Sequence, residues 1–308
     1  MIEHAGLLLE GGGMRCAYTA GVVDFFLDNG IEFPVVATAS AGTLIGSSYI
    51  SKQRDRNFKI LEELGSHPEQ TISLSNIIRK REIFGMDYIF DQIPRKIYPL
   101  DFYSFSNSSS KFLIGTTDVQ TGEPIFFDQF DTKDDLFTVI RASSSLPVLS
   151  PSTYYQGKEL VDGGVSDPIP IQPLIDNGLK KHVVILTRNR GYVKKGTSLH
   201  WFFQRVFKDK PELVELLRTR HIKYNETMEM LYEMEKNNQV FIIQPEKPLS
   251  ASRFERNKAK LRDLYIEGYQ AARDKLPALQ RFLTYEPRTV NHKIAESVTS
   301  LDLQLNMK

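Results

Sequence analysis

Three features of this sequence could take part in chemistry: a serine, an aspartate and a run of glycines. Ser40 stands in TASAG, directly after an apolar run and before a small-residue segment that suits a helix. A serine in a sharp turn between a strand and a helix exposes its hydroxyl, as in the nucleophile elbow G-x-S-x-G. Thr38 occupies the first glycine position of that pattern. A serine in this place is also a common helix N-cap, so both interpretations stay open.

Asp162 is the conspicuous candidate for a base, which a serine nucleophile needs. It follows a short apolar run in GKELVDGGVSDPIP and precedes Gly163 and Gly164, so we expect it at the end of a strand. An ordinary Asp-Gly turn would produce the same pattern. The six histidines lie in contexts that do not resemble a catalytic triad, and we expect them to be structural or exposed; they are His4, His67, His182, His200, His221 and His292.

Gly11, Gly12 and Gly13 separate a predicted strand from a predicted helix, and such a loop can turn backbone N–H groups toward an anion. The G-K-[ST] of a nucleotide-binding loop is absent, and Cys16 stands where a dinucleotide fingerprint has its third glycine. A transient oxyanion needs only two aimed N–H groups. A tight turn without a ligand is the alternative. Arg15 opposes the helix dipole, which suggests that it holds the loop or pairs with a carboxylate unless it is simply exposed.

Composition excludes several classes of protein. The chain of 308 residues has a formal net charge of +1, which gives no general argument for a nucleic-acid partner. Its single cysteine, Cys16, excludes an internal disulfide and a multi-cysteine metal site. The N-terminus lacks the basic and apolar regions of a signal peptide, and no apolar stretch is long enough to span a bilayer. We therefore expect a cytoplasmic protein.

The order of the predicted elements indicates a parallel α/β sheet. Alternating strands and helices are expected from residue 5 to about residue 187, with a helix that starts at Ser40 and a C-cap at Gly30. The predicted strands are 5–10, 33–39, two within 111–127 joined by a turn near Thr121 and Gly122, and 182–187.

Beyond a basic, glycine-containing segment at 188–198, the chain becomes mainly helical. Residues 240–243 predict one more strand and 252–276 an amphipathic helix. We place a domain boundary near residue 195, giving a catalytic domain of residues 1–195 and a C-terminal region of residues 196–308. One helical face in that region is apolar, with Leu213, Leu217, Tyr224, Met228 and Leu231.

Four ordered stretches resemble the patatin-like phospholipase family: EGGGMRCAYTAG, TASAG, IRASSSLPVLSP and VDGGVSDPIP. The resemblance covers about residues 5–190. It implies a patatin-like three-layer sandwich with a mostly parallel central sheet, and the C-terminal part looks like the helical extension of a bacterial subgroup. It also implies a Ser40–Asp162 dyad without histidine, an oxyanion hole at Gly11, Gly12 and Gly13, and supporting roles for Arg15, Gly42, Gly163 and Gly164.

The implied reaction is hydrolysis of a lipid or another acyl ester, without a cofactor or a metal. The implied partners are this substrate and, transiently, a membrane surface, with no nucleic acid; the oligomeric state is left open. The segments 77–94 and 201–210 mix basic and large apolar residues, so each could be a lid, although core packing is the stronger expectation. The alternatives are a patatin-fold module that binds an acyl chain or a partner without turnover and, more distantly, a nucleotide-binding α/β protein.

Overall fold

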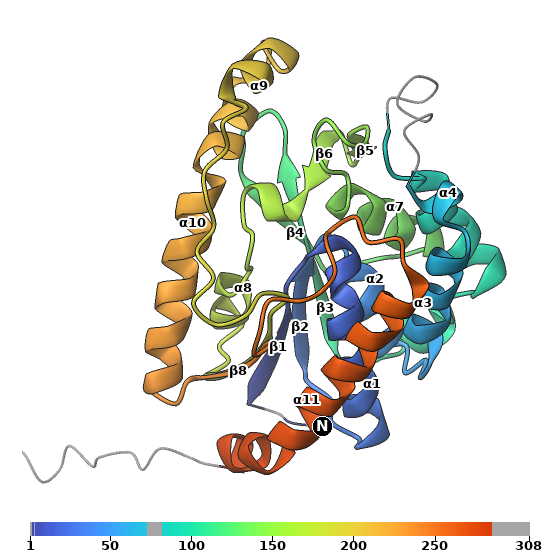
Figure 1. Cartoon of the computed structure of the whole chain (residues 1–308), viewed down its shortest axis with the longest axis vertical. Helices are drawn as coiled ribbons and strands as arrows, with labels where there is room; N and C mark the ends of the chain where they lie inside the picture. Colours follow the sequence, from blue (N-terminus) through green and yellow to red (C-terminus); the bar gives the residue numbers. More distant parts are fainter. Residues whose placement is uncertain (1, 3, 73–81, 285–308) are drawn as a thin grey trace, which may run out of the picture.

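The structure of the chain, a computed structural model, describes residues 2, 4–72 and 82–284. A mostly parallel sheet runs through its centre, with helices on both faces (Figure 1). The strand order is β5-β6-β3-β2-β1-β7-β8. β4 lies off this order and pairs with residues 114–117 of β3 in the antiparallel direction. The strands are β1 (Ala5–Leu9), β2 (Val35–Ala39), β3 (Lys111–Asp118), β4 (Pro124–Phe127), β5 (Thr153–Tyr155), β6 (Lys158–Asp162), β7 (Lys181–Ile185) and β8 (Val240–Ile243).

Parallel pairing brings the functional loops to one edge of this sheet. β1 pairs with β2 and β7, β2 pairs with β3, and β7 pairs with β8, all in parallel. Leu9 stands opposite both Thr38 and Ile185, so the chain leaves β1 and β2 at the same edge. β6 is antiparallel to β3, with Asp162 opposite Thr116. The carboxyl ends of parallel strands are where α/β proteins place their ligands.

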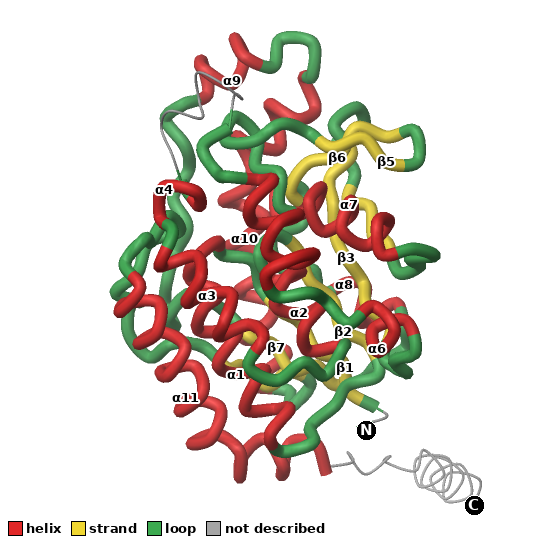
Figure 2. The backbone as a smooth tube through the Cα atoms, turned by 90° about the vertical axis from the view of Figure 1, so that its right-hand side faces the viewer, coloured by secondary structure: helices red, strands yellow, loops and turns green. Residues whose placement is uncertain are grey.

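Two helical layers cover the sheet (Figure 2). One face carries the larger hydrophobic cluster and the other a smaller cluster beneath two helices. The first layer contains α1 (Ala17–Asp28), α2 (Gly42–Ile50), α3 (Arg56–Ser66), α7 (Lys133–Ser143) and α11 (Lys258–Thr284), and the second contains α8 (Gln172–Asp176) and α10 (Pro211–Lys236). Shorter helical segments are η1 (Gly13–Cys16), α4 (Pro68–Thr71), η2 (Tyr88–Ile97), α6 (Phe102–Ser106), η3 (Gly163–Val165) and α9 (His200–Val206).

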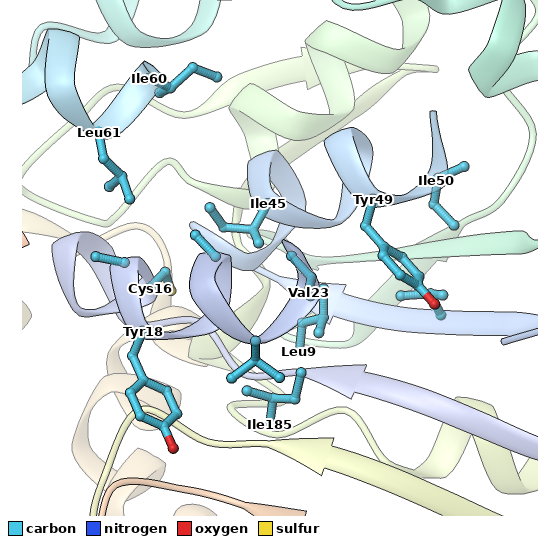
Figure 3. Packing of buried hydrophobic residues seen from close by; sticks show 14 of the residues in the cluster. Leu9, Cys16, Tyr18, Val23, Ile45, Tyr49, Ile50, Ile60, Leu61 and Ile185 are labelled. Atoms are coloured by element: carbon cyan, nitrogen blue, oxygen red, sulfur yellow. The ribbon is translucent and has the colours of Figure 1, made fainter. Parts of the chain in front are cut away.

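The larger cluster joins strands and helices behind the glycine loop. Figure 3 shows Leu9 and Ile185 of the sheet beneath Val23 of α1, with Ile45 of α2 close by. All four side chains are buried. A strand buried on both faces needs a continuous apolar run, and the residues Leu7, Leu8 and Leu9 supply it in β1.

The last helix belongs to the same core. α11 crosses α1 at two glycines: a Cβ at Gly21 would lie 1.9 Å from the Tyr265 carbonyl oxygen, and one at Gly268 would lie 1.9 Å from the Tyr18 carbonyl oxygen. The two backbones therefore touch. β8 also extends the central sheet beside β7, so the C-terminal region packs into the sheet and the helical layer formed by the earlier part of the chain.

The three-layer α/β architecture agrees with the sequence-based expectation, and most of its strands lie close to the predicted positions; β5 was not expected. Two boundaries differ. The helix expected from Ser40 begins at Gly42, because Ser40 itself adopts a left-handed conformation with φ +58°. The last helix begins at Lys258 rather than near residue 252 and ends at Thr284. Gly30 has the left-handed conformation expected of a C-cap, with φ +62°.

The two candidate lid segments behave differently. Residues 77–81 of the first lie outside the described residues, while Phe84, Met86 and Ile93 of its described part are buried in the larger cluster, as expected for core packing. For α9 that expectation is wrong: none of its residues is buried, and the Trp201 side chain is 66 % exposed. None of the described helices is both long and apolar enough to cross a lipid bilayer.

Candidate active site

Ser40 occupies a strained turn between β2 and α2. Its φ of +58° is a conformation that L-residues rarely adopt, and such strain is concentrated at functional sites. The Ser40 hydroxyl donates a hydrogen bond to Oδ2 of Asp162 over 2.6 Å. The N-cap residue of α2 is Ala41, and no side chain caps this helix. The Ser40 side chain therefore contacts a carboxylate from another strand instead of capping the helix that follows it.

Ser143 of α7 holds the backbone of the Ser40 turn in place by hydrogen bonds. The Ser40 N–H donates to Oγ of Ser143 over 2.9 Å, and that hydroxyl in turn donates to the Gly115 carbonyl over 2.6 Å. The Thr43 hydroxyl donates to the Ser40 carbonyl over 2.6 Å. Both polar backbone groups of the strained residue are thus satisfied, which holds it in a conformation that would otherwise relax.

Thr38 fits the elbow because Gly42 lacks a side chain. The Thr38 hydroxyl donates to the Leu9 carbonyl over 3.1 Å and is fully buried. A Cβ at Gly42 would lie only 2.3 Å from that hydroxyl oxygen and 2.9 Å from the Leu9 carbonyl oxygen. The departure from the G-x-S-x-G pattern is therefore accommodated by a hydrogen bond to β1 and by the glycine two residues after Ser40.

Asp162 ends β6 and is fully buried. Its Oδ1 accepts the Gly164 N–H over 2.8 Å, which leaves Oδ2 for the Ser40 hydroxyl. Burial raises the pKa of the Asp162 carboxyl, while the charge of Arg220 and the hydrogen bond from Ser40 act in the opposite direction. A carboxylate with a raised pKa and a serine hydroxyl at hydrogen-bond distance is an arrangement suited to proton transfer.

Two glycines let the chain turn closely around this carboxylate. A Cβ at Gly163 would lie 2.1 Å from the Gly115 carbonyl oxygen, so β6 and β3 approach without a side chain between them. A Cβ at Gly164 would lie 3.0 Å from Nη2 of Arg220 and 3.1 Å from Oδ1 of Asp162. The Asp162 motif is thus more than an exposed turn, because it brings a buried carboxylate to Ser40.

The glycine loop lies directly against Ser40. A Cβ at Gly11 would lie 2.7 Å from the Ser40 Cβ, and one at Gly12 would lie 2.7 Å from Oγ1 of Thr187. Gly13 has φ +59° and packs against Arg253. Within the described chain, the N–H groups of Gly11 and Gly12 donate to no protein acceptor. These two amides are therefore unpaired in a loop that packs against Ser40.

The loop continues into two buried residues of η1. Arg15 is buried, so the alternative of an exposed arginine is wrong, and burial together with the charge of Arg188 lowers its pKa. The Cys16 thiol is also buried and contacts the Glu10 carbonyl at 3.6 Å. Burial raises the pKa of this thiol to about 12, so it is not a reactive cysteine.

Two cavities of opposite character meet at Ser40. The first has a volume of about 320 Å³ and is lined mainly by glycine-loop residues and basic side chains: Glu10, Gly11, Gly12, Gly13, Arg15, Ala39, Ser40, Leu146, Gly164, Pro168, Arg188, Tyr192, Lys194, Lys195, Arg220, Tyr224 and Arg253. The second is lined mainly by apolar side chains from α2, α3 and the segment before and within η2: Leu44, Ile45, Ile60, Leu61, Leu64, Phe84, Met86, Ile89 and Phe90. Gly13, Ser40 and Leu146 line both cavities. Apolar cavities with a few convergent polar groups are typical ligand sites.

Comparison with known proteins agrees with this arrangement. A family profile described as patatin-like phospholipase matches residues 7–175, more than half of the chain. The chain belongs to the patatin-like phospholipase family. A second profile, described as a domain of unknown function (DUF6363), matches residues 210–284.

The relatives in this family are distant. The chain is 26 % identical to the uncharacterized protein YjjU of Escherichia coli over 298 residues, covering 94 % of this chain and 81 % of that protein. It is 26 % identical to lysophospholipase NTE1 of Cryptococcus neoformans over 59 % of this chain but only 11 % of the fungal protein. A human patatin-like phospholipase domain-containing protein 2 is 31 % identical over 36 % of this chain and 23 % of its own length. Among solved structures, VipD of Legionella pneumophila matches 88 % of this chain and 67 % of its own, with a TM-score of 0.41 and 14 % identity. Membership of this family supports a lipid hydrolase function.

Among the described residues, no histidine stands in the place of a base in this patatin-like site. None of the five histidines within the described residues lines either cavity, and His292 lies outside those residues. His182 is buried in β7, where burial lowers its pKa to about 4. In the same described ranges, no group of three or more His, Cys, Asp or Glu side chains could hold a metal ion.

Some residues around the site were not anticipated. Ser143 lies in the quoted stretch IRASSSLPVLSP, but its sequence context does not reveal that it supports Ser40. Arg188 and Lys194 lie in the basic, glycine-containing segment 188–198, which the sequence did not connect with the site. Arg220 stands between Leu217 and Tyr224 on the apolar face of α10, and a charged residue on such a face was the available signal.

Proposed function

We propose that this protein is a serine acyl hydrolase of the phospholipase A or carboxylesterase type, with Ser40 as nucleophile and Asp162 as base. The observation that carries the proposal is the 2.6 Å hydrogen bond from the hydroxyl of the strained Ser40 to the buried Asp162 carboxylate. The unpaired amides of Gly11 and Gly12 beside the same serine support it.

The reaction proceeds in two halves. Asp162 accepts the proton of the Ser40 hydroxyl as its oxygen attacks the acyl carbonyl, and the amides of the glycine loop stabilise the resulting oxyanion. Loss of one such donor costs about 3 kcal/mol in other enzymes. The C–O bond to the alcohol breaks, and the alcohol leaves with the proton from Asp162. A water molecule, deprotonated by Asp162, then attacks the acyl-enzyme; the acyl C–O bond to Ser40 breaks, Asp162 returns the proton to the Ser40 oxygen, and the fatty acid leaves.

The two cavities give each half of the substrate a place. The apolar cavity accepts the acyl chain, because its side chains from α2, α3 and η2 offer no hydrogen-bonding groups along most of the wall. The basic cavity, which Ser40 also lines, accepts the alcohol half. Gly13, Ser40 and Leu146 line both cavities, so the scissile ester can lie at their junction.

Labelling of Ser40 tests this function directly. We expect a fluorophosphonate probe to react with Ser40, and Ser40→Ala to abolish both labelling and hydrolysis of a chromogenic ester series of increasing chain length. Ser47→Ala is a matched control in α2, because the Ser47 hydroxyl donates only to the Leu44 carbonyl within the helix. Labelling of another serine, or full hydrolysis by Ser40→Ala with the control unchanged, would favour a patatin-fold module whose Ser40 is not a nucleophile.

The exposed α9 is where we propose transient contact with a membrane. Leu199, Trp201 and Val206 are exposed there, and Arg205 stands among them. Tryptophan and basic residues on one exposed segment favour an anionic lipid surface. We expect Trp201→Ala to reduce co-sedimentation with vesicles that contain anionic lipid, without changing hydrolysis of a water-soluble ester. Equal sedimentation of variant and wild type would contradict this role.

A further inference from the structure

The cavity on the alcohol side of Ser40 is unusually rich in positive charge. Six cationic side chains line it, Arg15, Arg188, Lys194, Lys195, Arg220 and Arg253, against the carboxylates of Glu10 and of the adjoining Asp162. Five of these cations, all except Arg15, follow residue 175 and lie outside the part of the chain that the patatin-like profile matches. The charge of this cavity is therefore set largely by residues 188–253, which follow the part of the chain that the patatin-like profile matches.

These cations are not neutralised by the protein. Among the described residues, none of the six takes part in an ion pair within 4.0 Å, whereas many surface lysines and arginines do; exposed examples are Arg190, Arg218 and Lys236. Arg15 is 6 % exposed, and its buried Nε has no hydrogen-bond partner. A buried cation without a partner is costly, so a ligand that supplies negative charge would stabilise the site.

The cations also oppose one another. Burial and the charges of Arg220 and Arg253 lower the pKa of Lys194 to about 7. Burial, followed by the charge of Arg220, lowers the pKa of Arg253. Like charges that depress one another's pKa face a common space, and an anion in that space would relieve the repulsion.

Aromatic rings and backbone hydrogen bonds hold several of these side chains in place. The Arg188 guanidinium lies 4.3 Å from the ring centre of Tyr192, and the Lys194 ammonium lies 4.8 Å from that of Tyr224. The Asn225 side chain accepts the Lys194 N–H over 2.9 Å and donates to the Lys194 carbonyl over 3.0 Å. A ligand would thus meet cations already oriented toward it, which reduces the entropy cost of binding.

Arg253 and Arg220 connect the same cavity to the catalytic loops. The Arg253 carbonyl accepts the Met14 N–H over 3.1 Å, and the Arg253 side chain lies against Gly13. Arg220 donates from Nε to the Gly164 carbonyl beside Asp162. The positive charge therefore begins next to the proposed nucleophile and base.

We propose that residues 188–253 complete a subsite for a phosphate dianion, and that the preferred substrates are acyl esters of phosphorylated alcohols with a phosphomonoester group. This inference rests on the proposed function. A phosphomonoester carries close to two negative charges and strong acceptor oxygens, which guanidinium groups bind in a bidentate manner. A phosphocholine group would bring a quaternary ammonium into a space that already holds excess cations. Hydrolysis breaks the acyl C–O bond and releases a fatty acid and the phosphorylated alcohol, with the phosphate unchanged.

The test compares three short-chain substrates with the same acyl group: a lysophospholipid with a phosphomonoester, one with phosphocholine, and the neutral monoacylglycerol. We expect kcat/KM to be highest for the phosphomonoester. In Arg188→Met and in Arg253→Met, its advantage over the monoacylglycerol should fall by about tenfold or more, mainly through a higher KM. Arg188→Lys should restore part of it. Arg190→Met is the matched control, because Arg190 lies two residues away but pairs with Glu235 outside the cavity.

Failure of this inference can be told apart from failure of the proposed function. Hydrolysis with equal kcat/KM for the phosphorylated and neutral esters, unchanged in the arginine variants, would overturn the subsite and leave the hydrolase intact. The opposite case is a protein that binds the phosphomonoester lipid but hydrolyses no ester, and calorimetric titration of the Ser40→Ala protein detects it. Tight binding of this lipid, weakened in the Ser40→Ala/Arg188→Met protein, supports the subsite even without hydrolysis. Glycerol phosphate and inorganic phosphate, titrated in parallel, show whether the lipid head group or free phosphate is the ligand. Equal affinity for the phosphomonoester and phosphocholine lipids would overturn the inference.

Discussion

At the scale of single residues, the chemistry depends on how Ser40 and Asp162 are held. Ser40 is kept in a left-handed conformation by hydrogen bonds to its N–H and its carbonyl, and Asp162 is kept buried with one oxygen on the Gly164 N–H. Without these hydrogen bonds, neither the left-handed conformation of Ser40 nor the burial of the Asp162 carboxylate would be favourable. The strain of one and the desolvation of the other are offset by the structure around them.

Asp162→Asn separates a base from a structural residue. The amide can keep the hydrogen bond from the Gly164 N–H and can donate to Ser40, but it cannot accept a proton. We expect kcat/KM to fall by about 10²–10⁴-fold with the fold retained, measured with a chromogenic ester and by thermal unfolding. A near-normal rate in a folded Asp162→Asn protein would contradict the dyad.

The pH dependence follows from the same carboxyl. Because the pKa of Asp162 is raised in the folded protein, its ionised form increases as the pH rises through that value, and the rate should rise with it in one limb. The free energy of unfolding depends on pH in the opposite direction. Because the pKa of Asp162 is higher in the folded than in the unfolded protein, this carboxyl favours the native state at low pH, and its contribution is lost as the pH rises through the pKa in the folded protein. The Asn variant should therefore unfold at a temperature no lower than the wild type at neutral pH.

At the scale of elements, the elbow depends on the close approach of β1, β2 and α2. Thr38 and Gly42 share one small space, with the Thr38 hydroxyl bonded to β1 and only 2.3 Å from where a Gly42 side chain would begin. The residue two positions before Ser40 and the residue two positions after it are thus a matched pair.

Gly42→Ala should destabilise the protein by about 1–3 kcal/mol and reduce hydrolysis, because the new methyl group displaces the start of α2. Thr38→Ala alone should cost about 1 kcal/mol for the lost hydrogen bond. The double variant should lose less than the sum of the two, since Thr38→Ala removes the nearest clash but not the one with the Leu9 carbonyl. Urea unfolding of the four proteins measures the coupling. Strict additivity would show that the two positions do not share the space.

At the scale of the whole molecule, α11 is built into the core beside α1. The helices meet backbone to backbone at Gly21 and Gly268, and Tyr265 of α11 donates from its hydroxyl to the buried Asp24 of α1 over 2.8 Å. The boundary near residue 195 stays a prediction about the organisation of the sequence. In space, the regions before and after it are packed together by β8 and α11.

Gly268→Ala tests this joining. A methyl group there would lie 1.9 Å from the Tyr18 carbonyl oxygen, so the helices must separate, and we expect a loss of about 1–3 kcal/mol in the free energy of unfolding. Gln270→Ala is the matched control on the exposed face of α11. If both variants unfold at the same denaturant concentration as the wild type, α11 does not contribute to the cooperative core.

The sequence by itself determined the α/β class, most strand positions and the family. These features could be predicted because they depend on residues that are close together in the sequence. Examples are the apolar runs, the glycines after strands, and the stretches TASAG and VDGGV. The start of α2 was misplaced because the left-handed conformation of Ser40 results from contacts with Ser143 and Asp162, more than a hundred residues away. Only the tertiary structure brought Arg188, Arg220 and Arg253 into one cavity with Arg15. These arginines belong to elements that are far apart in the sequence and meet only in the folded chain. No periodicity or spacing in the sequence therefore indicates that they line one cavity.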